Sequence, residues 1–166
     1  MTKDKLRITT KDIALIGLLL SIIEVVKVSL SFIPGVEMVS LLFMVYTLFF
    51  KEKMIYVLPA FCLIEGVLYG FGIWWFAYLY VWAVLVIAVY LFRAKQSVWF
   101  WSILLGIYGL LFGLLFTPIY LVTGGVGMAV SWWFSGITVD VIHGISNFVL
   151  CLILFKPLNR IIKMIK

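Results

Sequence analysis

Six long apolar runs, separated by short polar segments, make up almost the whole chain. They cover about residues 13–33, 38–50, 54–71, 74–92, 98–122 and 131–155. The runs are continuous and lack the strict alternation of apolar and polar residues that half-buried strands show, so each run predicts a helix. A helix needs about 20 apolar residues to cross a bilayer, and the second run is shorter than that. The pattern therefore predicts an all-α integral membrane protein with six transmembrane helices, the second of them short.

The composition favours lipid as the solvent of these helices. Of the 166 residues, 66% are hydrophobic and 12% are charged, whereas soluble domains have roughly 45–50% and 25%. A soluble chain of this length has too little interior to hide so much apolar surface. The first 12 residues are polar and the run after them carries Glu24 and Lys27, so we expect no signal peptide. Residues 1–166 are interpreted as one transmembrane domain that crosses the cell membrane several times.

The cations are distributed unevenly between the connections of these runs. Twelve of the 13 Lys and Arg residues precede the first run or follow the second, fourth and sixth runs: Lys3, Lys5, Arg7, Lys11, Lys51, Lys53, Arg93, Lys95, Lys156, Arg160, Lys163 and Lys166. The connections after the first, third and fifth runs have none. Because cytoplasmic connections carry the excess of Lys and Arg, both termini are predicted to be cytoplasmic. This placement also argues against nucleic acid as the partner of the net charge of +6.

Charged residues inside a span are costly and mark candidate functional sites. Glu24 and Lys27 are one helical turn apart, so they can pair within the first helix. Glu65 lies midway along the third run and needs a partner of its own. Lys27 is the one Lys inside a run, and it is therefore the candidate partner for Glu65 as well. Both pairings stay open at this point.

The strongest polar cluster is Asp140, His143 and Asn147 in the last run. Their spacings of three and four residues place them on one face of a helix. A carboxylate, an imidazole and an amide together suit a small polar heterocycle, although an interhelical hydrogen-bond network without a ligand has the same composition. Asp-x-x-His supplies two metal ligands, and only Glu65 is an obvious third, so we predict no metal site.

Aromatic residues are abundant toward the side that lacks cations. Tyr69, Trp74, Tyr78, Trp132 and Trp133 are candidates either for an interfacial belt or for stacking on a flat ligand. Residues 124–127, with three glycines, are expected to form a flexible loop that covers such a pocket. The chain has no Walker motif, no His-Glu-x-x-His and no Gly-x-Ser-x-Gly. We therefore expect neither an enzyme nor a bound cofactor in this chain.

The chain resembles the substrate-binding S components of energy-coupling factor (ECF) transporters. The resemblance rests on the length, the six runs with both ends inside, the short second run and residues 132–148, WWFSGITVDVIHGISNF, followed by LFKPL at 154–158. It covers the whole chain as topology, but only the last run as specific sequence.

This resemblance implies a partner complex and a ligand. The partners are a transmembrane scaffold subunit and two ATPase subunits, which hold the ATP and Mg²⁺. In the family the first helix docks through an Ala-x-x-x-Ala pattern, and the matching positions here are Gly17 and Ser21, with Ala14 one turn earlier. The two alanines are replaced, although small residues still allow close contact between helices.

The implied ligand is a vitamin or vitamin precursor, held near the outer face. We expect a small pyridine or pyrimidine alcohol, such as pyridoxine or hydroxymethylpyrimidine, with thiamine or pantothenate as alternatives. Three other functions stay open: a stand-alone carrier driven by ions, a small membrane transferase that uses Asp140 and His143, and a subunit that only mediates interactions.

Overall fold

The computed structural model describes residues 8–165 and contains helices but no β-strand in that range. The helices are α1 (Thr10–Leu30), α2 (Val39–Phe50), the short 3-10 helix η2 (Lys51–Lys53), α3 (Met54–Tyr69), α4 (Ile73–Leu91), α5 (Val98–Leu110) and α6 (Phe112–Ile165). The predicted all-α class is confirmed for this part of the chain. Lys3, Lys5, Arg7 and Lys166, which belong to the predicted cytoplasmic cations, lie outside the described residues.

Three helical stretches are long and apolar enough to cross a membrane, which indicates a membrane protein. They are Thr10–Leu30, Ile73–Leu91 and Val98–Met164. The 12 residues of α2 and the 16 of α3 reach only about 18 Å and about 24 Å, less than the roughly 30 Å of a hydrocarbon core. The six predicted crossings therefore stay a prediction.

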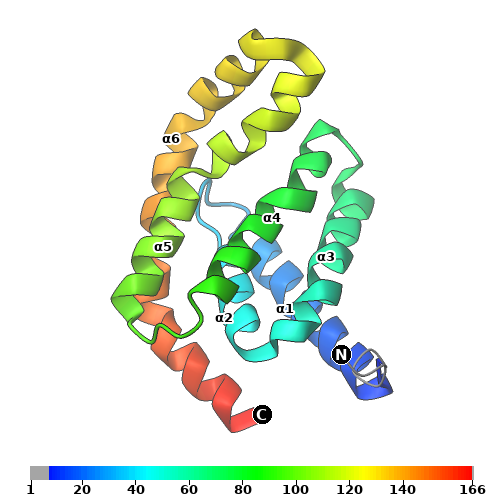
Figure 1. The fold of residues 1–166 in the computed structure, drawn as a ribbon, viewed down its shortest axis with the longest axis vertical. Coiled ribbons are helices and arrows are strands. Elements are labelled where there is room, and N and C mark those ends of the chain that lie inside the picture. Colours follow the sequence, from blue (N-terminus) through cyan, green and yellow to red (C-terminus); the bar gives the residue numbers. More distant parts are fainter. Residues whose placement is uncertain (1–7, 166) are drawn as a thin grey trace.

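The last of these stretches is not one straight rod, because α6 reverses direction at Gly125. This residue has φ 74° and ψ −175°, a conformation that L residues with a side chain rarely adopt. The two arms of α6, residues 112–124 and 126–165, lie side by side, as Figure 1 shows. The expected flexible loop at 124–127 is wrong, since Gly125 alone takes up the reversal and its neighbours stay helical.

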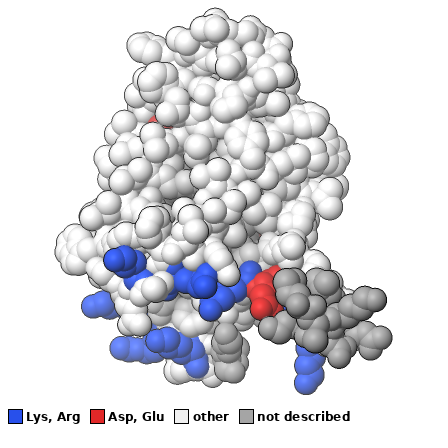
Figure 2. Space-filling view, in the orientation of Figure 1, with Lys and Arg blue, Asp and Glu red and all other residues white. Residues whose placement is uncertain are grey.

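The chain runs alternately toward and away from one end of the molecule, and both labelled termini lie at that end (Figure 1). The same end carries the Lys and Arg residues, as Figure 2 shows. At this end an ion pair between Lys53 Nζ and Asp12 Oδ1, 2.6 Å apart, joins η2 to α1. Asp12 also closes a capping box with Thr9 at the start of α1.

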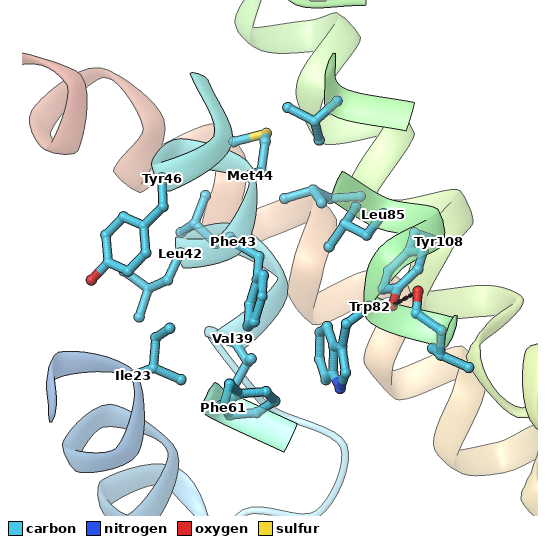
Figure 3. Packing of buried hydrophobic residues seen from close by; sticks show 14 of the residues in the cluster. Ile23, Val39, Leu42, Phe43, Met44, Tyr46, Phe61, Trp82, Leu85 and Tyr108 are labelled. Carbon is cyan, nitrogen blue, oxygen red and sulfur yellow. Dashed lines mark hydrogen bonds between the residues drawn. The ribbon is translucent and has the colours of Figure 1, made fainter. Parts of the chain in front are cut away.

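The centre of the fold is α2, whose residues from Val39 to Thr47 are all buried. A helix that is apolar on every side is stable only when neighbours surround it, and α1, α3, α4 and α6 all contact it. Phe43 stacks on Trp82 of α4 with ring centroids 5.1 Å apart and meets Phe61 of α3 edge-on at 5.2 Å. Figure 3 shows these three rings together.

The outer faces of the other α-helices are apolar, whereas polar side chains are buried. Val67, Val122 and Phe134 are each more than 70% exposed, while Glu65 and Asn147 are at most 1% exposed. Apolar residues on the outside and polar residues on the inside reverse the order of a soluble domain, and they match a helix bundle whose surroundings are lipid.

Glycines let α5 approach the second arm of α6 closely. A Cβ atom placed on Gly109 would lie 2.8 Å from the backbone Cα and N of Gly144, and one on Gly144 would lie 2.9 Å from the carbonyl oxygen of Gly106. Small residues at such crossings allow backbone to pack on backbone. This contact places the polar residues of the second arm against the rest of the bundle.

Candidate functional site

Two neighbouring cavities lie between the α1–α2 connection, α4 and the arms of α6. The central chamber, of about 240 Å³, is lined by Lys27, Gly35, Val36, Glu37, Val39, Phe61, Tyr78, Trp82, Phe112, Val139, Asp140 and His143. The aromatic chamber, of about 300 Å³, is lined by Phe112, Gly113, Phe116, Trp132, Ser135, Gly136, Val139 and Asp140. Phe112, Val139 and Asp140 belong to both linings, so these residues form the boundary between the chambers.

Asp140 is held in this boundary by the first turn of α6. The backbone N–H of Gly113 donates to Asp140 Oδ1 at 2.9 Å. That N–H is free for a side chain because Leu111 interrupts the helix, and the first N–H groups of a new helix lack partners within it. A Cβ atom on residue 113 would lie 2.4 Å from Asp140 Oδ2, so glycine is required for this approach.

The second carboxylate oxygen of Asp140, Oδ2, makes no hydrogen bond within the described part of the protein. Oδ2 is buried and has no hydrogen-bond partner there, and the residue as a whole is 6% exposed. A buried carboxylate oxygen without a partner is unfavourable by itself. Asp140 lines both chambers, and its Oδ2 is a hydrogen-bond acceptor that no described residue uses.

His143 faces Glu37 across the central chamber. Its Nε2 lies 3.0 Å from Glu37 Oε1, an ion-pair distance, but the ring N–H does not point at the oxygen as a linear hydrogen bond requires. The other Glu37 oxygen accepts from the Ser40 N–H at 2.9 Å, in the first turn of α2. Burial by itself raises the pKa of Glu37, yet His143 and Ser40 lower it by more, so the net shift is downward. Phe112 meets the His143 ring edge-on, with centroids 4.8 Å apart.

A second polar group lies beside the central chamber. Lys27 Nζ forms an ion pair with Glu65 Oε2 and lies 4.1 Å from the centroid of the Tyr69 ring. The predicted Lys27–Glu65 pair is therefore confirmed. Both carboxylate oxygens of Glu24 are buried without a hydrogen-bond partner in the described structure, so the alternative Glu24–Lys27 pair is not formed.

Aromatic rings form most of the remaining wall. Trp132 stacks on Tyr120 with ring centroids 4.1 Å apart and an interplanar angle of 19°. Tyr78 stacks on Phe61 and meets Phe116 edge-on, with centroids 6.2 and 5.9 Å apart. Pockets of this kind, mostly apolar with a few polar groups, hold small ligands in a defined orientation.

The structure brings some of the predicted site residues together and leaves others apart. Lys27, Tyr78, Asp140 and His143 line the central chamber, and Trp132 and Asp140 line the aromatic chamber. The others line neither chamber: Glu65, Tyr69, Trp74, Trp133 and Asn147.

Each of the residues outside the chambers has a different setting. Trp74 packs edge-on against Tyr78, with centroids 5.0 Å apart, and so supports the wall from behind. Tyr69 and Trp133 are 53% and 38% exposed. Asn147 is fully buried one turn beyond His143, and its amide has no hydrogen-bond partner among the described residues.

Sequence reasoning missed Glu37 and three rings that line the central chamber, those of Phe61, Trp82 and Phe112. Glu37 had a detectable signal, because it is the one charged residue in the connections that lack cations. The three rings had none, since each lies within an apolar run that has many similar residues. Within residues 8–165 no group of three His, Cys, Asp or Glu side chains is arranged to hold a metal ion.

The docking positions predicted on α1 lie on its outer face. Ala14, Gly17 and Ser21 are exposed, and a Cβ atom on Gly17 would meet nothing within 4 Å. Ser21 Oγ donates to the Gly17 carbonyl at 2.8 Å, which keeps this hydroxyl along the helix. These three positions are therefore exposed in the isolated chain.

No protein-family model, no curated protein and no solved structure matches this chain.

Proposed function

We propose that this chain is the substrate-binding S component of an ECF-type transporter that takes up a vitamin or vitamin precursor. The observation that carries the proposal is Asp140, a residue that lines two aromatic-walled chambers and whose buried Oδ2 has no hydrogen-bond partner among the described residues. A carboxylate in a largely apolar site costs free energy that a hydrogen-bonding ligand recovers.

The chambers suit a small aromatic heterocycle with hydroxyl groups. Asp140 and His143 offer polar contacts at one side, and the rings of Phe112, Tyr78 and Trp132 form flat walls. Lys27 is the one cation in the lining, and Glu65 already neutralises it. We therefore favour a pyridine or pyrimidine alcohol over an anionic ligand such as pantothenate.

The placement of the site supports uptake from outside the cell. The central chamber includes Gly35, Val36 and Glu37 of the α1–α2 connection, which lies on the side without Lys or Arg. With six crossings and cytoplasmic termini, this side faces outward. The chain has no ATP-binding motif, so the energy for transport comes from ATPase subunits that join through a membrane scaffold.

Native mass spectrometry of the gently purified protein, with extraction of the bound metabolite, tests the ligand. We expect one small heterocycle in a one-to-one complex that is lost in Asp140→Asn. Uptake by the chain alone in proteoliposomes, driven by a proton gradient, would identify an ion-coupled carrier instead. If the purified protein converts the extracted compound into a covalently changed product, the chain is instead a transferase that uses Asp140 and His143.

Docking is tested at the open face of α1. Gly17→Leu is expected to abolish assembly with the scaffold and ATPase subunits and to leave ligand binding by the isolated chain unchanged, because nothing in the chain packs on this position. Leu18→Val, on the same exposed side of the helix, is the matched control and should assemble normally. Normal assembly of Gly17→Leu contradicts the docking assignment.

A further inference from the structure

A larger cavity, of about 730 Å³, lies at the end of the molecule that carries the cations. The α4–α5 connection contributes Arg93 and Lys95 to its lining, and the end of α6 contributes Lys156, Arg160 and Lys163. The three residues of α6 are spaced by four and three positions, so they lie on one face of that helix. Two segments that are distant in the chain therefore direct five cations toward one cavity, and its lining contains no carboxylate.

These charges are not neutralised within the described protein. The ion pairs of residues 8–165 are Lys27 with Glu65, Lys53 with Asp12 and His143 with Glu37, and none involves a residue of this cavity. Arg93 instead stacks on the Tyr90 ring, 4.0 Å from its centroid. Like charges gathered in one cavity repel each other unless an anion binds between them. The charge of this lining therefore favours a negatively charged group.

The rest of the lining distinguishes a lipid from a free anion. Leu48, Phe49, Phe155 and Met164 provide an apolar wall beside the cations. A small phosphate compound has no apolar part to contact such a wall. A phospholipid does, because its acyl chains lie next to its headgroup. Asn159 also lines the cavity, and its amide oxygen is buried without a hydrogen-bond partner among residues 8–165. This oxygen can accept a bond from a headgroup hydroxyl.

We propose that this cavity binds the headgroup of an anionic phospholipid from the cytoplasmic leaflet. The phosphate lies against Lys156, Arg160 and Lys163, a headgroup hydroxyl donates to Asn159, and the acyl chains follow the apolar wall. Basic pockets between membrane helices on the cytoplasmic side are suited to such headgroups. The proposal depends on the membrane location and orientation of the chain, not on its role in transport.

Native mass spectrometry of the full chain in detergent tests this site by titration with phosphatidylglycerol. Phosphatidylcholine with the same acyl chains and glycerol 3-phosphate serve as the two comparison ligands. We expect tight binding of phosphatidylglycerol only. The double variant Arg160→Gln/Lys163→Gln should bind it about 30-fold more weakly, since each cation near a membrane surface contributes roughly a fivefold factor. The matched control, Lys11→Gln/Lys51→Gln, removes the same charge from the same end but outside the cavity, and should change the affinity less than twofold.

Three results would overturn the proposal. Equal binding of phosphatidylcholine would show that the headgroup is not recognised. Glycerol 3-phosphate that competes at similar concentrations would assign the cavity to a free phosphate compound. An equal loss of affinity in the two double variants would reduce the effect to the general charge of this end.

The hydroxyl contact has its own test. Phosphatidylmethanol carries the same charge as phosphatidylglycerol but no headgroup hydroxyl, so we expect it to bind about fivefold more weakly, the worth of one hydrogen bond. Asn159→Leu should remove this preference and leave the binding of phosphatidylmethanol unchanged. Equal affinity of both lipids for the unaltered protein would overturn the role of Asn159.

Discussion

Single polar side chains decide what this bundle can bind, because almost everything around them is apolar. Asp140 and Asn147 show how much depends on position. Both lie in the second arm of α6 and both are buried, but only Asp140 reaches the two chambers. Asp140 is held there by the Gly113 N–H, a contact that exists because the helix restarts after Leu111. Helical spacing alone does not separate these two roles.

Substitutions at these two positions should have different effects on ligand affinity. Asp140→Asn keeps the size of the side chain and removes its charge, so ligand affinity should fall about 5- to 150-fold while the protein still folds. Asn147→Leu should leave the affinity within about twofold, because residue 147 lines neither chamber. Calorimetric titration with the extracted ligand measures both effects. Wild-type affinity in Asp140→Asn would place the ligand elsewhere.

Glu37 is predicted to make stability depend on pH. Its pKa is lowered from 4.5 in the folded protein, so its contribution is full above pH 4.5 and is lost as the pH falls through the lower folded value. At pH 7 the Glu37→Gln variant should therefore have a free energy of unfolding about 1–3 kcal/mol below that of the wild type. Its melting temperature should be lower as well. This difference should shrink at acidic pH.

The matched control for this experiment is Glu52→Gln, which changes an exposed carboxylate in η2. Its melting temperature should follow that of the wild type throughout the pH series. A gap between wild type and Glu37→Gln that stays constant down to pH 3 would show that the lowered pKa of Glu37 does not contribute to stability.

At the scale of elements, packing determines how much of each helix is visible to its surroundings. Helix α2 is enclosed on all sides, and α5 lies directly on the second arm of α6 through glycines. Helix α1, by contrast, has the small residues Ala14, Gly17 and Ser21 exposed on its outer face. The same residue type, glycine, therefore serves internal packing at position 109 and leaves an open surface at position 17.

Alanine at these two glycines should have opposite effects on stability. At Gly109 the added methyl group meets the Gly144 backbone at 2.8 Å, so we expect a loss of about 1–3 kcal/mol from overpacking. At Gly17 the methyl group enters open space, and the better helix propensity of alanine should leave stability equal or higher. Thermal unfolding in one detergent compares the two. A Gly109→Ala variant as stable as the wild type would mean that the two helices separate easily.

For the whole molecule, the gathering of cations at one end sets the predicted orientation. Lys11, Lys51, Lys95 and Lys163 come from four different parts of the chain. Figure 2 shows that Lys and Arg gather at one end of the molecule. Because the helices run alternately toward and away from this end, six crossings would place every basic connection in the cytoplasm.

Labelling of intact cells tests this orientation. A cysteine at Gly127, next to the reversal of α6, should react with an impermeant thiol reagent, and a cysteine at Lys95 should react only after the cells are opened. The background is a variant without Cys62 and Cys151, which are both buried. The reverse labelling pattern would show that the proposed site lies on the inner side of the membrane and not on the outer side.

The amino-acid sequence by itself determined the helical class, the approximate ends of the first four long helices and the end of the molecule that carries the cations. These are local properties: the length of an apolar run, the residues that interrupt it and the charges that flank it decide them without reference to distant parts of the chain. The small number of charges inside the bundle reduced the partners of Lys27 to Glu24 and Glu65, and the structure shows the pair with Glu65.

Only the tertiary structure decided which face of each helix points inward. Uniformly apolar helices carry little amphipathic signal, since both protein and lipid accept apolar side chains. For that reason neither the enclosure of α2 nor the rings of Phe61, Trp82 and Phe112 could be read from the sequence pattern. The Glu37–His143 contact and the single-residue reversal at Gly125 likewise depend on how distant segments meet. The binding chambers exist through such long-range packing, which no local pattern in this chain encodes.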